Sequence, residues 1–217
     1  MSTFEAEYFE ANYPDYAAQN PPGKLAFYRR VIERRAPQRR PLDLVDVGCG
    51  LGRFVASLPP ETYRPHGTDV SHWALGKNRE QFPHVDFREA SATETPFEDG
   101  SMDVVTAFDV IEHVPDLDAV GEAVASMLRP GGLFVFVVPV YDGLSGPLIH
   151  LLDKDPTHVH KHPRGFWLDW AAERFRVLEW WGILRYLLPW GRYLHVPTRR
   201  FRNHVPAILV AARWEGP

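Results

Sequence analysis

The sequence predicts an α/β protein built on a doubly wound, mostly parallel sheet of seven strands with helices on both faces. Between about residues 42 and 139, short β-branched runs alternate with longer segments of helical spacing, and this alternation is the pattern of such a sheet. The run Leu133–Val138 is apolar throughout, which suits a strand that is buried on both faces of a parallel sheet.

Each expected strand is a short run bounded by turn residues; the runs lie at residues 42–47, 64–69, 85–88, 102–108, 133–138, 175–181 and 205–213. A first helix is expected over 51–58, where the apolar residues share one face. Ser71 and Asp116 are side chains typical of helix N-caps, and they predict helices over about 72–82 and 117–128.

Two regions do not follow this alternation. Residues 1–40 read as one or two helices that carry several aromatic side chains, and residues 140–203 read mainly as loops rich in His, Pro, Trp and Arg. Five of the seven tryptophans lie between Trp167 and Trp190, so this stretch must bury or offer much aromatic surface.

Composition and charge narrow the class of protein. The 217 residues are 45% hydrophobic and 24% charged, a balance that excludes disordered, collagen-like and coiled-coil chains. The formal net charge of −4 argues against a protein that mainly grips nucleic acid. A single cysteine, Cys49, excludes an internal disulfide. No signal peptide is visible, and no apolar run approaches the ~20 residues of a membrane span, so we expect a soluble cytoplasmic protein.

The strongest motif is the glycine loop, the run Asp46-Val47-Gly48-Cys49-Gly50-Leu51-Gly52 between the first strand and the first helix. Glycines allow a tight turn and a close approach of a ligand, and ligands of open α/β sheets bind beyond the carboxyl ends of the strands. Asp69 ends the next strand, 21 residues after Gly48, where a carboxylate can accept hydrogen bonds from both hydroxyls of an adenosine ribose.

The glycine spacing distinguishes two cofactor classes. A nicotinamide enzyme would carry G-x-G-x-x-G, with its last glycine where this chain has Arg53; the third glycine here is Gly52. Asp46 is out of place beside a pyrophosphate and well placed beside a cationic amino acid moiety. The loop therefore favours a cofactor with an amino acid moiety, and a nicotinamide oxidoreductase stays open as an alternative.

Four segments together resemble the class I S-adenosylmethionine-dependent methyltransferases, in their small-molecule, type 11-like branch. They are the glycine loop and residues 96–105, 108–114 and 128–133; the resemblance is good over 42–140 and looser over 157–160. It implies a Rossmann-like methyltransferase fold whose last strand is antiparallel. It also implies one domain, 1–217, made of a helical cap (1–40), a cofactor-binding core (42–140), acceptor-side insertions (140–203) and a last strand (204–214).

The resemblance also implies the cofactor, S-adenosylmethionine, and its contacts. The implied cofactor-binding residues are Asp46, Gly48, Cys49, Gly50, Gly52, Asp69, Val70, Ser91, Ala92 and Asp109. Asp69 would hold the ribose hydroxyls, and Val70, Ser91 and Ala92 would meet the adenine. The glycine loop, Asp46 and Asp109 would surround the methionine end. Ser91 stands where the family often has an aspartate, so its contact with the adenine amino group can pass to a backbone carbonyl or a water.

Three histidines, His113, His158 and His160, are candidates for the acceptor side of the reaction. His113 follows the fourth strand, close to the expected reactive methyl, where it could act as a general base or only shape the loop. His158, His160 and His162 alternate and would share one face of an extended strand. Metal ligation, an acceptor-site role and a solvated loop are the alternatives for them; because methyl transfer from a sulfonium needs no metal, we expect no metal site.

The expected function is methyl transfer to the oxygen, nitrogen or carbon of a small, partly apolar acceptor, with S-adenosylhomocysteine as product. The sulfonium is already activated, so the protein mainly supplies positioning and exclusion of water. A non-catalytic S-adenosylmethionine-binding protein is the other open alternative. The acceptor is the expected partner, a homodimer is allowed, and neither nucleic acid nor membrane is expected.

Overall fold

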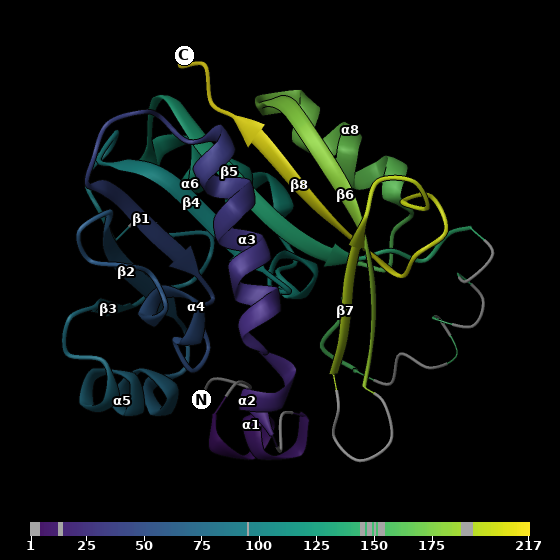
Figure 1. Ribbon diagram of the computed structural model, residues 1–217, viewed down its shortest axis with the longest axis horizontal. Helices are drawn as coiled ribbons and strands as arrows, with labels where there is room; N and C mark the ends of the chain where they lie inside the picture. The colour runs from purple at the N-terminus through teal and green to yellow at the C-terminus, as the bar shows by residue number, and fades with distance from the viewer. Residues whose placement is uncertain are drawn as a thin grey trace.

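The computed structural model describes residues 5–12, 15–94, 96–143, 146, 149, 151, 155–187 and 193–217. They contain one eight-stranded sheet in the order β3-β2-β1-β4-β5-β8-β6-β7 (Figure 1). The doubly wound, mostly parallel fold that the sequence predicts is confirmed, with eight strands where seven were expected.

The strands are β1 (Leu42–Val47), β2 (Tyr63–Asp69), β3 (Asp86–Glu89), β4 (Met102–Phe108), β5 (Leu128–Pro139), β6 (Arg176–Leu187), β7 (Tyr193–Thr198) and β8 (Ala207–Arg213). From β3 to β5 all neighbours are parallel. β8 is antiparallel to both β5 and β6, which confirms the antiparallel last strand, and β7 is antiparallel to β6.

The additional strand, β7, is the main correction to the sequence prediction. It pairs with the second half of β6, which continues past Trp181 to Leu187. β7 contains Pro197 and shows no regular alternation of buried and exposed residues, so its sequence does not indicate a strand. Proline is tolerated there because β7 is an edge strand and has only one neighbour to pair with.

The helices are α1 (Ala6–Asn12), α2 (Tyr16–Gln19), α3 (Pro22–Arg35), α4 (Arg53–Ala56), α5 (His72–Gln81), the 3₁₀ turn η1 (Ile111–His113), α6 (Leu117–Met127) and α8 (Arg164–Arg174). The predicted caps are confirmed: Ser71 accepts a hydrogen bond from the Ala74 N–H, and Asp116 accepts one from the Ala119 N–H.

Three helix predictions need correction. The N-terminal region holds three helices, because α3 starts anew at Pro22, a residue that favours the first helical turn. α4 is shorter than the expected 51–58, since the left-handed Gly52 is its N-cap. α8 lies in the 140–203 stretch that was expected to be mainly loops.

The sheet is covered on both faces, by α3, α4 and α5 on one and by α6 and α8 on the other (Figure 1). The packing on both faces of β5 explains why its sequence is apolar. Phe134 and Phe136 belong to the core under α6 and α8, whereas Val135 and Val137 belong to the core under α3. In the part of the chain that the structure describes, no helix combines the length and apolar character needed to cross a bilayer.

Candidate active site

A cavity of about 550 Å³ opens at the carboxyl ends of the central strands, with α1 and α2 of the helical cap among its walls. All the residues that the sequence predicts for the site line this cavity, except Gly52 and His160. Residues far apart in sequence, from the glycine loop to Tyr193 on β7, therefore share one chamber.

The glycine loop needs glycine at its turns. Gly48, Gly50 and Gly52 all have positive φ angles, of 66°, 52° and 66°, which side chains rarely tolerate. A Cβ on Gly48 would lie 2.5 Å from a methyl of Val110, and one on Gly50 would lie 2.8 Å from the Tyr16 hydroxyl. Gly52 faces away from the cavity and caps α4, so its place in the loop is to set the turn.

Asp69, at the end of β2, is held by the backbone of two neighbouring segments. Its Oδ2 accepts a hydrogen bond from the Gly50 N–H at 2.8 Å, and its Oδ1 accepts one from the Ser71 N–H at 2.9 Å. Burial raises the pKa of the Asp69 carboxyl, and these backbone N–H groups oppose that rise. Each carboxylate oxygen keeps a second lone pair with which it can accept from a ligand.

The carboxyl of Asp46 is buried and forms no ion pair with a described residue. The Thr106 hydroxyl donates to its Oδ1 at 2.6 Å. Burial raises the pKa of Asp46 to about 7, and the nearby Asp69 adds to the rise. A cationic group of a ligand placed here would favour the ionised carboxylate.

The expected adenine end of the cavity is formed by Val70, Ser91 and Ala92, which follow β2 and β3. The Ser91 hydroxyl lies 2.9 Å from the hydroxyl of Thr93, and its N–H donates to Glu94. The hydroxyl and the N–H of Ser91 are thus both engaged with neighbouring residues.

Asp109 and Lys24 carry opposite charges in the wall beside the glycine loop. Asp109 is the one residue other than glycine with positive φ, 59°, among those described. It forms an ion pair with Arg185 of β6. Although burial opposes it, the charges of Arg185 and Lys24 hold the pKa of Asp109 below its ordinary value.

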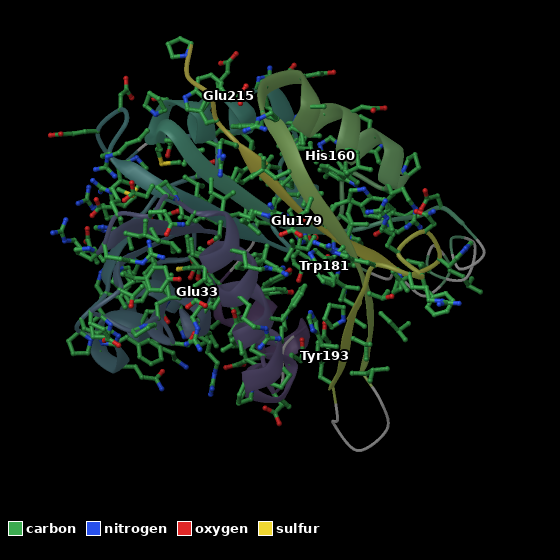
Figure 2. The ribbon with its side chains drawn as sticks, turned by 45° about the horizontal axis from the view of Figure 1, so that its top comes forward. Glu33, His160, Glu179, Trp181, Tyr193 and Glu215 are labelled. Atoms are coloured by element: carbon green, nitrogen blue, oxygen red, sulfur yellow. The ribbon has the colours of Figure 1, made fainter. Side chains whose placement is uncertain are left out.

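Lys24, on α3, is a site residue that sequence reasoning missed, since no motif surrounds it. Its ammonium donates to the Gln19 carbonyl at 3.3 Å and lies 5.2 Å from the centre of the ring of Tyr193, which Figure 2 labels on β7. Burial lowers the pKa of Lys24 to about 8. No described carboxylate forms an ion pair with it, so it can receive an anionic group of a ligand.

The other end of the cavity holds His113 and His158, whose ring centres lie 4.6 Å apart. The Nδ1 of His113 lies 2.8 Å from the Thr157 hydroxyl, and the Nδ1 of His158 lies 3.2 Å from the hydroxyl of Tyr141. Burial and the neighbouring His158 lower the pKa of His113. These two predicted histidines therefore come together although 45 positions separate them in the sequence.

His160 lies elsewhere. Its Nε2 donates to the Val114 carbonyl at 2.9 Å, its Nδ1 lies 3.3 Å from His162, and its ring is beside Trp167 of α8 (Figure 2). Residues 158–163 form no strand, so the expectation that three alternate histidines share one face is wrong: His158 faces His113, and His160 faces His162.

Glu112 is a second residue that sequence reasoning missed as a site residue. Its side chain is fully buried and borders the cavity. Among the described residues, neither oxygen of its carboxyl has a hydrogen-bond partner. Burial, and next the charge of Asp109, raise the pKa of Glu112 well above its ordinary value. Its place before His113, in the segment 108–114 that resembles the methyltransferase family, was the signal that could have marked it.

Comparisons with known proteins agree with this geometry. The family model for a methyltransferase domain matches residues 16–191. A relative from Mycolicibacterium smegmatis, named "Probable S-adenosylmethionine-dependent methyltransferase", is 33% identical over 112 residues, which are 52% of this chain and 42% of the relative. The ubiquinone biosynthesis O-methyltransferase of Aromatoleum aromaticum is 37% identical over 98 residues, 43% of this chain and 42% of that protein.

Each of these matches spans less than half of the relative's length. Among solved structures, a chain from the complex of the Haloferax volcanii Trm112 methyltransferase activator superposes with a TM-score of 0.72. It is 18% identical, and the superposition covers 95% of this chain and 97% of that chain. At this identity, the likeness concerns the fold.

Proposed function

This chain belongs to the methyltransferase domain family, and we propose that it transfers the methyl group of S-adenosylmethionine to a small, partly apolar acceptor. The observation that carries the proposal is the single cavity in which the glycine loop and Asp69 share a chamber with a histidine pair and several aromatic side chains. A direct transfer between two bound molecules requires that the cofactor and the acceptor bind in one continuous cavity.

The cofactor would lie along the carboxyl ends of β1 and β2. We assign the ribose hydroxyls to Asp69, the adenine to the Val70, Ser91 and Ala92 end, and the methionine moiety to the glycine loop. Asp46 would face the positive charge of that moiety, which would favour its ionised form. Lys24 would receive the methionine carboxylate, because its ammonium is buried and forms no ion pair with a described carboxylate.

The acceptor would enter between the cofactor and the histidine pair. His113 and His158 would take the proton from the attacking oxygen, nitrogen or carbon, whereas His160 does not line the cavity and hydrogen-bonds to the Val114 carbonyl. In the transfer, the attacking atom bonds to the methyl carbon while the carbon–sulfur bond breaks, and S-adenosylhomocysteine leaves. The helical cap, through Phe9 and Tyr16 in the cavity wall, would keep water out.

We also propose a small molecule rather than a nucleic acid as the partner. The net charge is −4, and the basic run 199–202 is partly neutralised: Arg199 pairs with Glu179 and stacks on Trp181 (Figure 2). The relative named for ubiquinone biosynthesis supports an acceptor with apolar parts. We keep the cytoplasm as the expected compartment and a homodimer as a state that sedimentation can test.

Calorimetry with four ligands tests the cofactor. We expect S-adenosylmethionine and S-adenosylhomocysteine to bind and NADH and NADPH not to bind; preferential binding of a nicotinamide would contradict the proposal. Incubation with methyl-labelled cofactor and a panel of hydroxylated, amino and carbon-acid acceptors then tests transfer. His113→Ala should lower turnover and keep cofactor binding. Cofactor binding without transfer to any acceptor would favour the non-catalytic alternative.

A further inference from the structure

The buried carboxyl of Glu112 has an unexplained environment. It is fully shielded from solvent and has no hydrogen-bond partner among the described residues, although buried polar groups are nearly always paired. Its main-chain carbonyl is in use, since it accepts from the N–H groups of Val159 and His160. The backbone is therefore anchored while the side chain borders the cavity and lacks a partner.

Two imidazoles lie beside this carboxyl. Ligand atoms of Glu112, His113 and His158 all lie within 4.8 Å of one another. Two of these residues come from η1, after β4, and the third comes from the distant segment 155–163, so the cluster exists only in the folded chain. Two histidine nitrogens and one carboxylate oxygen are a common donor set for divalent transition metals and zinc.

The hydrogen bonds around the first imidazole orient it for ligation. The Thr157 hydroxyl donates its one proton to Asp155 Oδ1 at 2.5 Å, so its oxygen is left to accept from Nδ1–H of His113 at 2.8 Å. This arrangement puts the lone pair of His113 on Nε2. Metal-bound histidines characteristically donate their other ring N–H in this way.

The second imidazole also has a hydroxyl group beside its Nδ1. The Nδ1 of His158 lies 3.2 Å from the hydroxyl of Tyr141, and a donation from this nitrogen again leaves the lone pair on Nε2. The charges nearby also suit a cation: the carboxyls of Asp109 and Asp155 lie close to Glu112, with Arg185 as the positive group among them.

We propose that Glu112, His113 and His158 bind a divalent metal ion at the acceptor end of the cavity, with open coordination positions facing the acceptor. The proposal deepens the proposed function and rests on it for the acceptor. The substrate class would be a molecule with two neighbouring oxygens, such as a vicinal diol or a hydroxy-carbonyl compound, that chelates the ion.

The ion would lower the pKa of the bound acceptor hydroxyl. The hydroxyl would then release its proton to water. The resulting oxygen anion attacks the methyl carbon, the carbon–sulfur electron pair moves to sulfur, and the neutral thioether leaves. The sum is acceptor hydroxyl plus sulfonium giving methyl ether, thioether and one proton. In this form of the reaction, His113 and His158 hold the ion and do not themselves remove the proton.

Metal binding can be measured without an acceptor. Protein freed of metal with a chelator is titrated with Zn²⁺ by calorimetry and with Co²⁺ by visible absorption, which reports the ligand field directly. We expect one ion per chain. Glu112→Gln, which keeps the side-chain shape, and His113→Ala should each weaken binding by about tenfold or more. His72→Ala is the matched control: this exposed histidine also contacts a carboxylate, of Glu89, and its loss should change nothing.

The two proposals can fail separately. Binding of S-adenosylhomocysteine, measured on the same samples, reports whether each variant is folded and whether the cofactor site exists. Absence of one-to-one metal binding by the wild type, or equal binding by Glu112→Gln, overturns the metal site and leaves the methyltransferase proposal standing. Failure to bind S-adenosylhomocysteine would instead count against the proposed function. Once an acceptor is known, transfer that resists a chelator would also overturn the metal site.

Discussion

Arg185 of β6 donates a hydrogen bond to the carboxylate of Asp109, the residue that follows β4. The two strands are separated in the sheet by β5 and β8, so the pair closes the cavity wall across two intervening strands. Both side chains are only partly exposed, and both line the cavity. The pair thus connects β4, in the parallel half of the sheet whose motifs the sequence shows, with β6, in the antiparallel half that carries no such motif.

Removing one partner should destabilise the fold. We expect Arg185→Met to lower the free energy of unfolding by roughly 1–3 kcal/mol, less than for a fully buried pair because water in the cavity screens the carboxylate left behind. The double variant Arg185→Met, Asp109→Asn should recover part of this loss. Urea denaturation of the three proteins measures it, and a single variant as stable as the wild type would show that the pair contributes nothing.

Asp69 should matter both to the cofactor and to the fold. Asp69→Ala removes two acceptors for ribose hydroxyls, so we expect S-adenosylhomocysteine to bind roughly 10- to 1000-fold more weakly. It also leaves the N–H groups of Gly50 and Ser71 without their acceptor, which should lower stability by about 1–3 kcal/mol. Calorimetry and urea denaturation separate the effects. Asp86→Ala, an exposed aspartate on β3 outside the cavity, should leave binding unchanged. Unchanged binding in Asp69→Ala would give this residue a structural role only.

Lys24 should distinguish ligands with and without a carboxylate. We expect Lys24→Met to weaken the binding of S-adenosylhomocysteine by roughly 10- to 100-fold, which corresponds to the loss of a charge-assisted hydrogen bond. The binding of 5′-methylthioadenosine, which lacks the amino acid moiety, should not change. The pKa of Lys24 is lowered to about 8, so its charge is present below that pH and lost above it. The preference for S-adenosylhomocysteine over methylthioadenosine should thus decline as pH rises through about 8 in the wild type. An equal loss for both ligands would place Lys24 away from the carboxylate.

Asp46 should make the ligand-free protein less stable at neutral and higher pH. Its pKa is raised to about 7 in the fold, against about 4 in an unfolded chain. Between these values the unfolded state releases a proton that the folded state keeps, so this contribution to stability is present below pH 4 and lost as pH rises to about 7. Asp46→Asn should therefore be more stable than the wild type at pH 8, by on the order of 2–4 kcal/mol, and similar to it at pH 4.

The same variant should bind S-adenosylmethionine more weakly, because it cannot present a negative charge to the cationic moiety. Urea denaturation at both pH values and calorimetry measure the two effects. A stability difference that does not depend on pH would contradict the assigned ionisation of Asp46, and undiminished binding would separate Asp46 from the cofactor.

Short sequence motifs were sufficient to predict those features whose residues are close together along the chain. The glycine loop follows a buried strand, needs positive φ at three positions and is only seven residues long, so it could be recognised without knowledge of the rest. Ser71 and Asp116 each cap a helix that begins at the next residue. The apolar run 133–138 indicated a strand with both faces covered, because neither face can be polar there.

Sequence reasoning failed where pairing partners are distant. β7 contains a proline and shows no alternation, and it exists because β6 extends far enough to pair with it. Lys24 has no motif of its own, Glu112 lies in the segment 108–114 without a role assigned to it, and His160 looked equivalent to His158. Their roles depend on which neighbours the fold brings to them.

The sequence by itself therefore determined the class of fold, the glycine loop, Asp69 and the kind of cofactor, since these follow from backbone geometry and short-range spacing. Only the tertiary structure decided that Lys24, Arg185 and Asp109 share one wall and that His158 rather than His160 meets His113. It also decided that the buried Glu112 carboxyl has no hydrogen-bond partner among the described residues. Burial and proximity set the charge of such groups, and both are properties of packing between segments that lie far apart along the chain.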